Sequence, residues 1–184
     1  VSADDVLSSP LNQNLHLLGW SASPTLVTSS VAFTGDSPII SSLAVTSDEK
    51  YALLGDNSGF SSVPNRVAVV EIGASSLSAL GTLSPIEDPA DIETSPFDAT
   101  ALVSSGFGNA LFVLSHDPGN PKLPYSLKEL SYQGGAPQLP VDMVQIRRGT
   151  LSGRVLVAEV PGVRQVSFAA GKVPVDLGTF TLGA

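Results

Sequence analysis

The side chains best suited to chemistry are few in this sequence and stand far apart. His16 and His116 are its only histidines, and neither belongs to an HExxH or H-x-H spacing. Two histidines so arranged do not predict a metal centre. A histidine without a partner acid or base is also weak evidence for catalysis. We interpret both as packed, structural residues.

The segment GWSAS, residues 19–23, resembles the GxSxG motif, which holds a catalytic serine on a strained strand-to-helix turn. Its final glycine is missing, and the following PTLVTSSVAF reads as a strand. Cysteine is absent, which excludes disulfides, thiolate metal sites and a cysteine nucleophile. Ser21 is therefore not assigned as a nucleophile, and no catalytic residue, metal ligand or cofactor is predicted.

The chain is acidic, with a formal net charge of −8, and 42% of its residues are hydrophobic. An acidic protein is a poor partner for nucleic acid, because phosphates require a basic surface. The longest apolar runs are strand-sized and fall short of the roughly 20 residues that span a membrane. Few lysines and many small polar residues favour an extracytoplasmic location, whether periplasmic, secreted or at the cell surface.

The elements that would position any site follow from a repeat. NRVAVVEI (65–72) is echoed by NALFVLSH (109–116) and by GRVLVAEV (153–160), at two equal intervals of 44 residues. Upstream, TSDEKYALLG (46–55) pairs with TSPFDATALVS (94–104). Helical periodicity is scarce, and 17 glycines and 14 prolines punctuate short strand-like runs. An all-β repeat of about 40–45 residues is typical of a β-propeller with four-stranded blades.

The repeated strand is apolar almost without interruption, as VAVV, LFVL and VLVA show. Such a strand is expected to have both faces covered, whereas a sandwich with one wet face per sheet would alternate polar and apolar residues. Propeller blades pack face to face on two neighbours. The pattern therefore favours a propeller over a sandwich.

These residues resemble the YVTN-type, lactonase-like β-propellers. The resemblance covers about 41–133, where a polar turn, an apolar strand and a second strand beginning at an asparagine follow one another; the third copy keeps only GRVLVAEV. The resemblance implies a fold and not a reaction, because the family includes binding proteins, cell-surface proteins, subunits of cofactor enzymes and some lactonases. Nothing matched here is catalytic.

The repeat predicts about four blades' worth of sequence in a single β-propeller domain, or part of one, with partial blades at both ends. Complete blades are expected at about 41–84, 89–133 and 139–170. Residues 14–34 are expected to be the last two strands of an earlier blade, and 173–182 the first strand of a later one. Three arrangements remain open: a small closed ring, a ring of two chains, or part of a larger ring, which we favour.

The loops before the repeated strand form the candidate binding surface. In a propeller, equivalent loops of successive blades crowd around one mouth of the channel and could line a common surface. Plain turn chemistry is the alternative, since glycine and asparagine supply left-handed turn conformations. The predicted channel-mouth contacts are Asp56, Asn57, Phe60, Phe107 and Asn109.

Two functions are weighed. The preferred one is a non-enzymatic binding or scaffold module for an unidentified protein or small molecule, in a ring completed by further blades or a second copy. The alternative is a lactonase-like or cofactor-dependent hydrolase or oxidoreductase domain with its site at the channel mouth. That alternative requires a cluster of buried ionisable groups there, and the carboxylates to inspect are Asp56, Asp91, Asp98 and Asp142.

Overall fold

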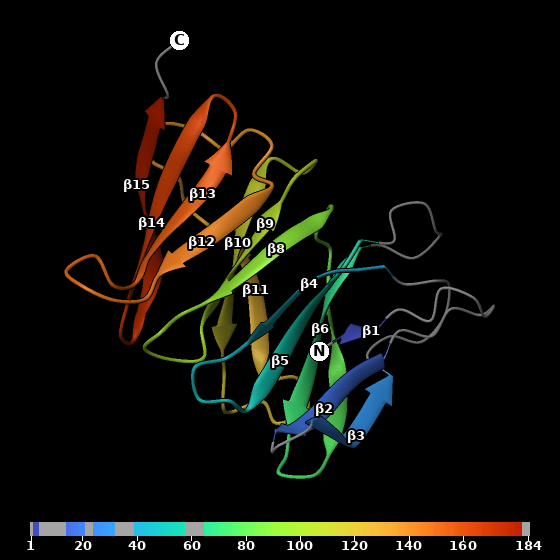
Figure 1. Ribbon diagram of the computed structural model, residues 1–184. Helices are drawn as coiled ribbons and strands as arrows, with labels where there is room; N and C mark the ends of the chain where they lie inside the picture. Colours follow the sequence, from blue (N-terminus) through green and yellow to red (C-terminus); the bar gives the residue numbers. More distant parts are fainter. Residues whose placement is uncertain (1, 4–13, 21–23, 32–38, 58–64, 182–184) are drawn as a thin grey trace.

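The computed structural model describes residues 2–3, 14–20, 24–31, 39–57 and 65–181, which form strands and no helix (Figure 1). None of these residues belongs to a helix able to cross a membrane. Three antiparallel sheets have four strands each, as the all-β expectation requires, and a fourth sheet has three. In every sheet the strands follow one another in chain order.

The three-stranded sheet, here called the end sheet, contains β1 (Ser2–Ala3), β2 (Asn14–Trp20) and β3 (Pro24–Val31). The first blade contains β4 (Ile40–Val45), β5 (Tyr51–Asp56), β6 (Arg66–Ile72) and β7 (Leu77–Leu83). The second contains β8 (Pro89–Thr94), β9 (Ala101–Ser105), β10 (Ala110–His116) and β11 (Tyr125–Glu129). The third contains β12 (Asp142–Ile146), β13 (Arg154–Glu159), β14 (Gly162–Ala169) and β15 (Lys172–Thr181).

The sheets stack in chain order, from the end sheet at the lower right of Figure 1 to the third blade at the upper left. The first strands of successive blades are neighbours, with β4 beside β8 and β8 beside β12. This is the blade arrangement of a β-propeller, in which the first strand of each blade lies innermost. The predicted fold class is confirmed.

Alternate side chains of one strand supply two different cores. In β6, Val67 and Val69 pack toward the second blade, whereas Ala68 and Val70 pack with Leu15 of the end sheet. All four β6 side chains are at most 1% exposed. The unbroken apolar run therefore has the cause expected from the sequence, because each face of the strand is covered by another sheet.

β10 repeats this pattern one blade later. Leu111 and Val113 pack toward the third blade with Val155 and Val157, and Leu114 packs toward the first blade. The first and second blades thus have apolar side chains on both faces. One strand of each blade, β6 or β10, contributes to the interfaces on both of its sides. Burial of this kind stabilises the fold by roughly 25 cal/mol for each Å² of apolar surface removed from water.

The third copy of the repeat does not occupy the equivalent strand. NRVAVVEI and NALFVLSH form the third strands of their blades, but GRVLVAEV forms β13, the second strand of the third blade. The reason is the connection between blades: only 84–88 separate β7 from β8, whereas 130–141 separate β11 from β12. A fixed interval of 44 residues therefore arrives one strand early in the third blade.

Because the third copy of the repeat occupies the second strand of its blade, two expectations for the third blade are wrong. Residues 173–182 do not begin a later blade, because β15 pairs with β14 and completes the third blade, with Ser167 opposite Val175. β13 is also covered on one face only: Val155 and Val157 are fully buried, but Leu156 is half-buried and Ala158 is exposed. No sheet in the described part of the chain lies on its other side.

We predict that Val69→Asp, Val113→Asp and Val157→Asp each unfold the protein. An unpaired buried carboxylate costs several kcal/mol, a large share of the roughly 5–15 kcal/mol that stabilises a domain. Far-UV circular dichroism during thermal denaturation measures the effect. Ala79→Asp, at an exposed position of β7, is the matched control and should melt near the wild-type temperature. Wild-type melting of Val69→Asp or Val113→Asp would contradict the packing of β6 and β10 between two cores, and wild-type melting of Val157→Asp would contradict its burial against the second blade.

Candidate functional site

Loops from successive blades meet at one end of the stack, around the carboxylate of Asp88. Asn57 follows β5, and its amide Nδ2 donates to Oδ1 of Asp88. Phe107 follows β9, and its backbone N–H donates to Oδ2 of the same carboxylate at 3.2 Å. Asn109 begins the approach to β10, and its Oδ1 accepts the Leu139 N–H at 2.7 Å. We call these five residues, together with Val141, the rim.

The predicted channel-mouth residues divide between the rim and the interior. Asn57, Phe107 and Asn109 belong to the rim. Asp56 is fully buried, where its carboxylate accepts hydrogen bonds from Arg66 Nε and from a backbone N–H, both at 3.0 Å. This ion pair joins the last residue of β5 to the first residue of β6. Phe60 lies outside the described residues, as does Ser21.

Three of the four described non-glycine residues with positive φ belong to the rim. The φ angles are 54° at Asp88, 49° at Asn109 and 50° at Leu139. Aspartate and asparagine tolerate this conformation, but a bulky side chain rarely adopts it, at a cost of roughly 1–3 kcal/mol. Leu139 is also 38% exposed. A strained, exposed leucine is a feature that packing alone does not explain.

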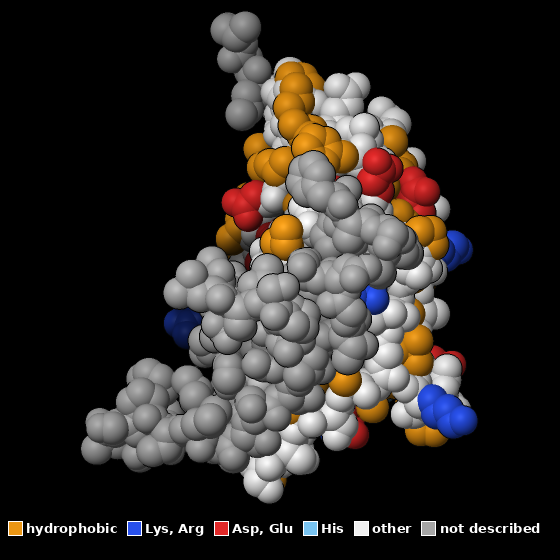
Figure 2. Space-filling model, turned by 90° about the vertical axis from the view of Figure 1, so that its right-hand side faces the viewer, with side chains coloured by type: hydrophobic (Ala, Val, Ile, Leu, Met, Phe, Trp, Pro, Cys, Tyr) orange, Lys and Arg blue, Asp and Glu red, His pale blue; other side chains and the backbone are white. Residues whose placement is uncertain are grey.

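The rim presents apolar side chains to solvent. Phe107 is 73% exposed and Val141 is 49% exposed. A Cβ added at Gly106 would lie 3.8 Å from the Val141 side chain, which places the β9–β10 turn beside Val141. Figure 2 shows hydrophobic side chains at the upper end of the molecule, where the third blade lies in Figure 1. Phe107, Leu139 and Val141 thus form an apolar surface over a hydrogen-bonded frame.

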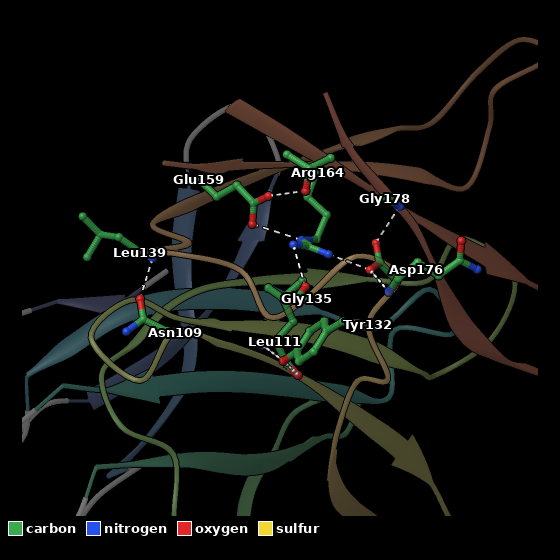
Figure 3. Close-up of polar contacts among 11 residues, drawn as sticks. Asn109, Leu111, Tyr132, Gly135, Leu139, Glu159, Arg164, Asp176 and Gly178 are labelled. Atoms are coloured by element: carbon green, nitrogen blue, oxygen red, sulfur yellow. Dashed lines mark hydrogen bonds and ion pairs between the residues drawn. The ribbon is translucent and has the colours of Figure 1, made fainter. Parts of the chain in front are cut away.

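A buried arginine anchors the connection that carries Leu139. Figure 3 shows the Arg164 guanidinium between Glu159 and Asp176, with nitrogen–oxygen distances of 3.0 and 2.6 Å. The same group donates to the Gly135 carbonyl at 3.1 Å and lies 5.5 Å from the centre of the Tyr132 ring. Arg164 is 3% exposed. These contacts fix residues 130–141 against the third blade and so fix the rim.

The sequence reasoning missed this anchor. Arg164 stands among valines in VRQV, and Asp176 follows VPV, so each interrupts an apolar strand face. A charged residue at an inward strand position predicts a buried partner of opposite charge. The alternation alone could have suggested the pair, but the carbonyl of Gly135 and the ring of Tyr132 come from a loop that no periodicity describes.

Carboxylates also line the inner strands of the second and third blades. Asp91 Oδ2 accepts the backbone N–H of Met143 at 2.9 Å, and Glu93 Oε1 accepts that of Gln145 at 3.2 Å. Among the described residues β12 has no strand on this side, so these carboxylates bond its edge N–H groups; the Met143 N–H also donates to Asp142 Oδ1 at 3.0 Å. The exposed Asp142 lies next to Asp91 at the same edge.

Burial raises the pKa of Asp91, and the neighbouring Asp142 carboxylate adds to the rise, although N–H groups of Ile92 and Met143 oppose it. Burial likewise raises the pKa of Glu93, against the attraction of Arg147. Like charges held close together disfavour simultaneous ionisation. This inner edge therefore retains protons at a higher pH than free carboxylic acids do.

The remaining candidates lie away from the rim. Asp98 accepts the N–H groups of Thr100 and Gly171 at 3.0 and 3.1 Å. Burial opposes its ionisation, but these hydrogen bonds prevail and lower the pKa of Asp98. His116 packs against the rings of Tyr51 and Tyr125, each 5.4 Å away, and these two rings also contact each other. Among the described residues no three His, Cys, Asp or Glu side chains are placed to hold a metal ion.

Comparison with solved structures supports the fold. A functionally unknown protein from Desulfotomaculum acetoxidans DSM 771 superimposes with a TM-score of 0.62 at 13% identity. The periplasmic gluconolactonase PpgL of Pseudomonas aeruginosa superimposes with a TM-score of 0.67 at 12% identity. Both alignments cover 94% of this chain and 50% of the other, so the chain spans about half the length of these structures.

Sequence comparison adds no finer assignment. No protein-family model matches the chain, and no curated protein matches it. At 12–13% identity the two structural likenesses show the fold alone. The blades and the structural neighbours thus establish the propeller-like fold. They establish neither a repeat family nor an activity.

We predict that Leu139→Gly is more stable than Leu139→Ala by about 1 kcal/mol, because glycine alone adopts φ of 50° without steric cost. Both variants lose the apolar contacts beyond Cβ, so their difference reports mainly the backbone conformation. Chemical denaturation of the two proteins measures it. Equal stabilities, or a more stable alanine variant, would show that the backbone at this position carries no strain.

We also predict that Asp142→Asn stabilises the protein at neutral pH. The folded state raises the pKa of Asp91 above its ordinary value of about 3.8, so its favourable contribution is present below that value and is lost as pH rises through the folded pKa. Removing the Asp142 charge reduces this loss. The gain over wild type should therefore shrink as pH falls toward 4.

Urea denaturation across this pH range measures the difference, with Glu71→Gln as the control for removal of one exposed negative charge. A stability gain that stays constant with pH, or that equals the gain of the control, would contradict the coupling between Asp91 and Asp142.

Proposed function

We propose that this protein is a non-enzymatic β-propeller binding module of YVTN-like type, which captures an apolar or aromatic segment of a protein partner on its rim. The observation that carries the proposal is the exposed Leu139, held in a left-handed conformation beside the exposed Phe107. Strain of this kind persists where the surrounding structure imposes it, and it is concentrated at binding and active sites.

The chemistry of the rim supports this role. Phe107 supplies a large apolar contact, and aromatic anchors carry much of the energy of protein interfaces. The side chains of Asp88 and Asn109 accept hydrogen bonds from backbone and side-chain groups within the rim. The frame is therefore already ordered before binding, which lowers the entropic cost of association.

The candidate carboxylates support a non-enzymatic role for a second reason. Asp56 is paired with Arg66 inside the first blade, and both oxygens of Asp98 accept backbone N–H groups. Asp91 and Glu93 bond the edge of β12. A catalytic acid or base must be able to reach its substrate. Three of the four candidate carboxylates, together with Glu93, therefore make hydrogen bonds that maintain the fold.

A second candidate function rests on Asp142. Its exposed carboxylate adjoins Asp91, whose pKa is raised chiefly by burial and further by the charge of Asp142. A neighbouring acid and base could activate water against an ester or lactone carbonyl. The fold likeness to a periplasmic gluconolactonase makes a lactone the substrate class to test, and agrees with our proposal of an extracytoplasmic location.

The test of the binding role is selection of a phage-displayed peptide library on the purified wild-type protein. We expect recovered peptides rich in aromatic and aliphatic residues, whose dissociation constant rises at least about tenfold with Phe107→Ser. Leu151→Ser removes an exposed apolar side chain away from the rim and is the control. Peptides that bind both variants equally would remove the rim from the proposal.

A titration assay with glucono-δ-lactone separates the two functions. The binding role predicts hydrolysis no faster than the spontaneous reaction. Acceleration that Asp142→Asn abolishes, with the variant still folded, would favour the hydrolase instead.

A further inference from the structure

One face of the third blade carries apolar side chains that no described part of the chain covers. Val144 is 58% exposed, Val175 is 50% and Phe180 is 62%. The register places these residues together, because Val144 lies opposite Leu156 and Val163 lies opposite Phe180. We call this surface the open face; its members are Val144, Leu156, Val163, Val175, Leu177 and Phe180.

Equivalent faces in the other blades are buried. A leucine stands on the corresponding side of the second strand in each blade: Leu53 in β5, Leu102 in β9 and Leu156 in β13. Leu53 packs onto the second blade and Leu102 onto the third, and both are 0% exposed. Leu156 is in the same place on its sheet but remains half-buried. The open face is thus built like a blade interface without the following blade.

We propose that a second copy of this chain covers the open face, so that two chains close one propeller ring. The two structural alignments cover 94% of this chain but only 50% of each matched structure. Two copies of the chain together therefore have about the length of one such structure. The end sheet lies at the opposite end of the stack from the open face (Figure 1). Each copy then places its end sheet on the open face of the other.

This geometry satisfies the requirement for closure. A contact between two different surfaces forms a closed ring when the rotation between copies returns to its start, and otherwise forms an open filament. Rotation by half a turn about the ring axis creates two identical interfaces and leaves no open face. Gln165 and Ser167 give the face some polar character at its third strand, as in interfaces between separately folded chains.

The inference is independent of the rim. Size-exclusion chromatography with light scattering on the wild-type protein should give twice the chain mass of 18.9 kDa. Val175→Glu and Leu156→Glu should shift the protein to the monomer mass, because each buries an unpaired charge in the interface. Leu151→Glu changes an exposed leucine in a turn outside the open face and should remain dimeric. Far-UV circular dichroism verifies that each variant is folded.

Two outcomes would overturn the proposal. One is a wild-type protein that stays monomeric at high micromolar concentration, which would mean that a second copy does not cover the face. The other comes from Val175→Cys, which introduces the sole cysteine of the chain. In the closed ring the two copies of this position lie in separate interfaces, so oxidation should not link them. Rapid formation of a disulfide-linked dimer would mean that two open faces meet each other.

Discussion

The fold depends on the packing of each sheet face against the next, because no strand pairs across two blades in the described structure. Val67 and Val69 of β6 serve one interface while Ala68 and Val70 serve another. A change in one strand is therefore felt in two cores. Side chains also bind the inner edges: the Thr94 hydroxyl donates to the Val45 carbonyl at 3.0 Å, and carboxylates of β8 bond β12.

This division of labour explains where function can reside. Inner-edge carboxylates satisfy strand-edge N–H groups, and the Arg164 network fixes the connection between the second and third blades. These contacts give the rim a rigid base. Leu139 can hold a costly backbone conformation because Asn109 bonds its N–H and Arg164 restrains the loop behind it. Rigidity in the blades is what permits a strained, exposed contact in the loops.

The sequence predicted the parts that periodicity controls. Continuous apolar runs at β6 and β10 predicted strands covered on both faces, and they are. The fixed interval failed in the third blade because connection lengths, which repeats do not record, differ between blades. Site chemistry was less accessible still: the pair Asp56–Arg66 follows from hairpin register, but Asp91 meets Met143 only through stacking of separate blades. Contacts between sheets carry no local sequence signal.

Ring closure and the rim are linked by symmetry. A half-turn about the ring axis does not exchange the two ends of the strands, so both rims of a closed ring would face the same side. Two Phe107 side chains would then be presented on one surface, and a partner with two apolar segments could engage both. Binding the second segment becomes intramolecular, which raises overall affinity by 10²–10⁴, roughly, without any new type of contact. A monomeric Val175→Glu variant should therefore retain the affinity of one rim for a single peptide and lose the gain for a tandem one.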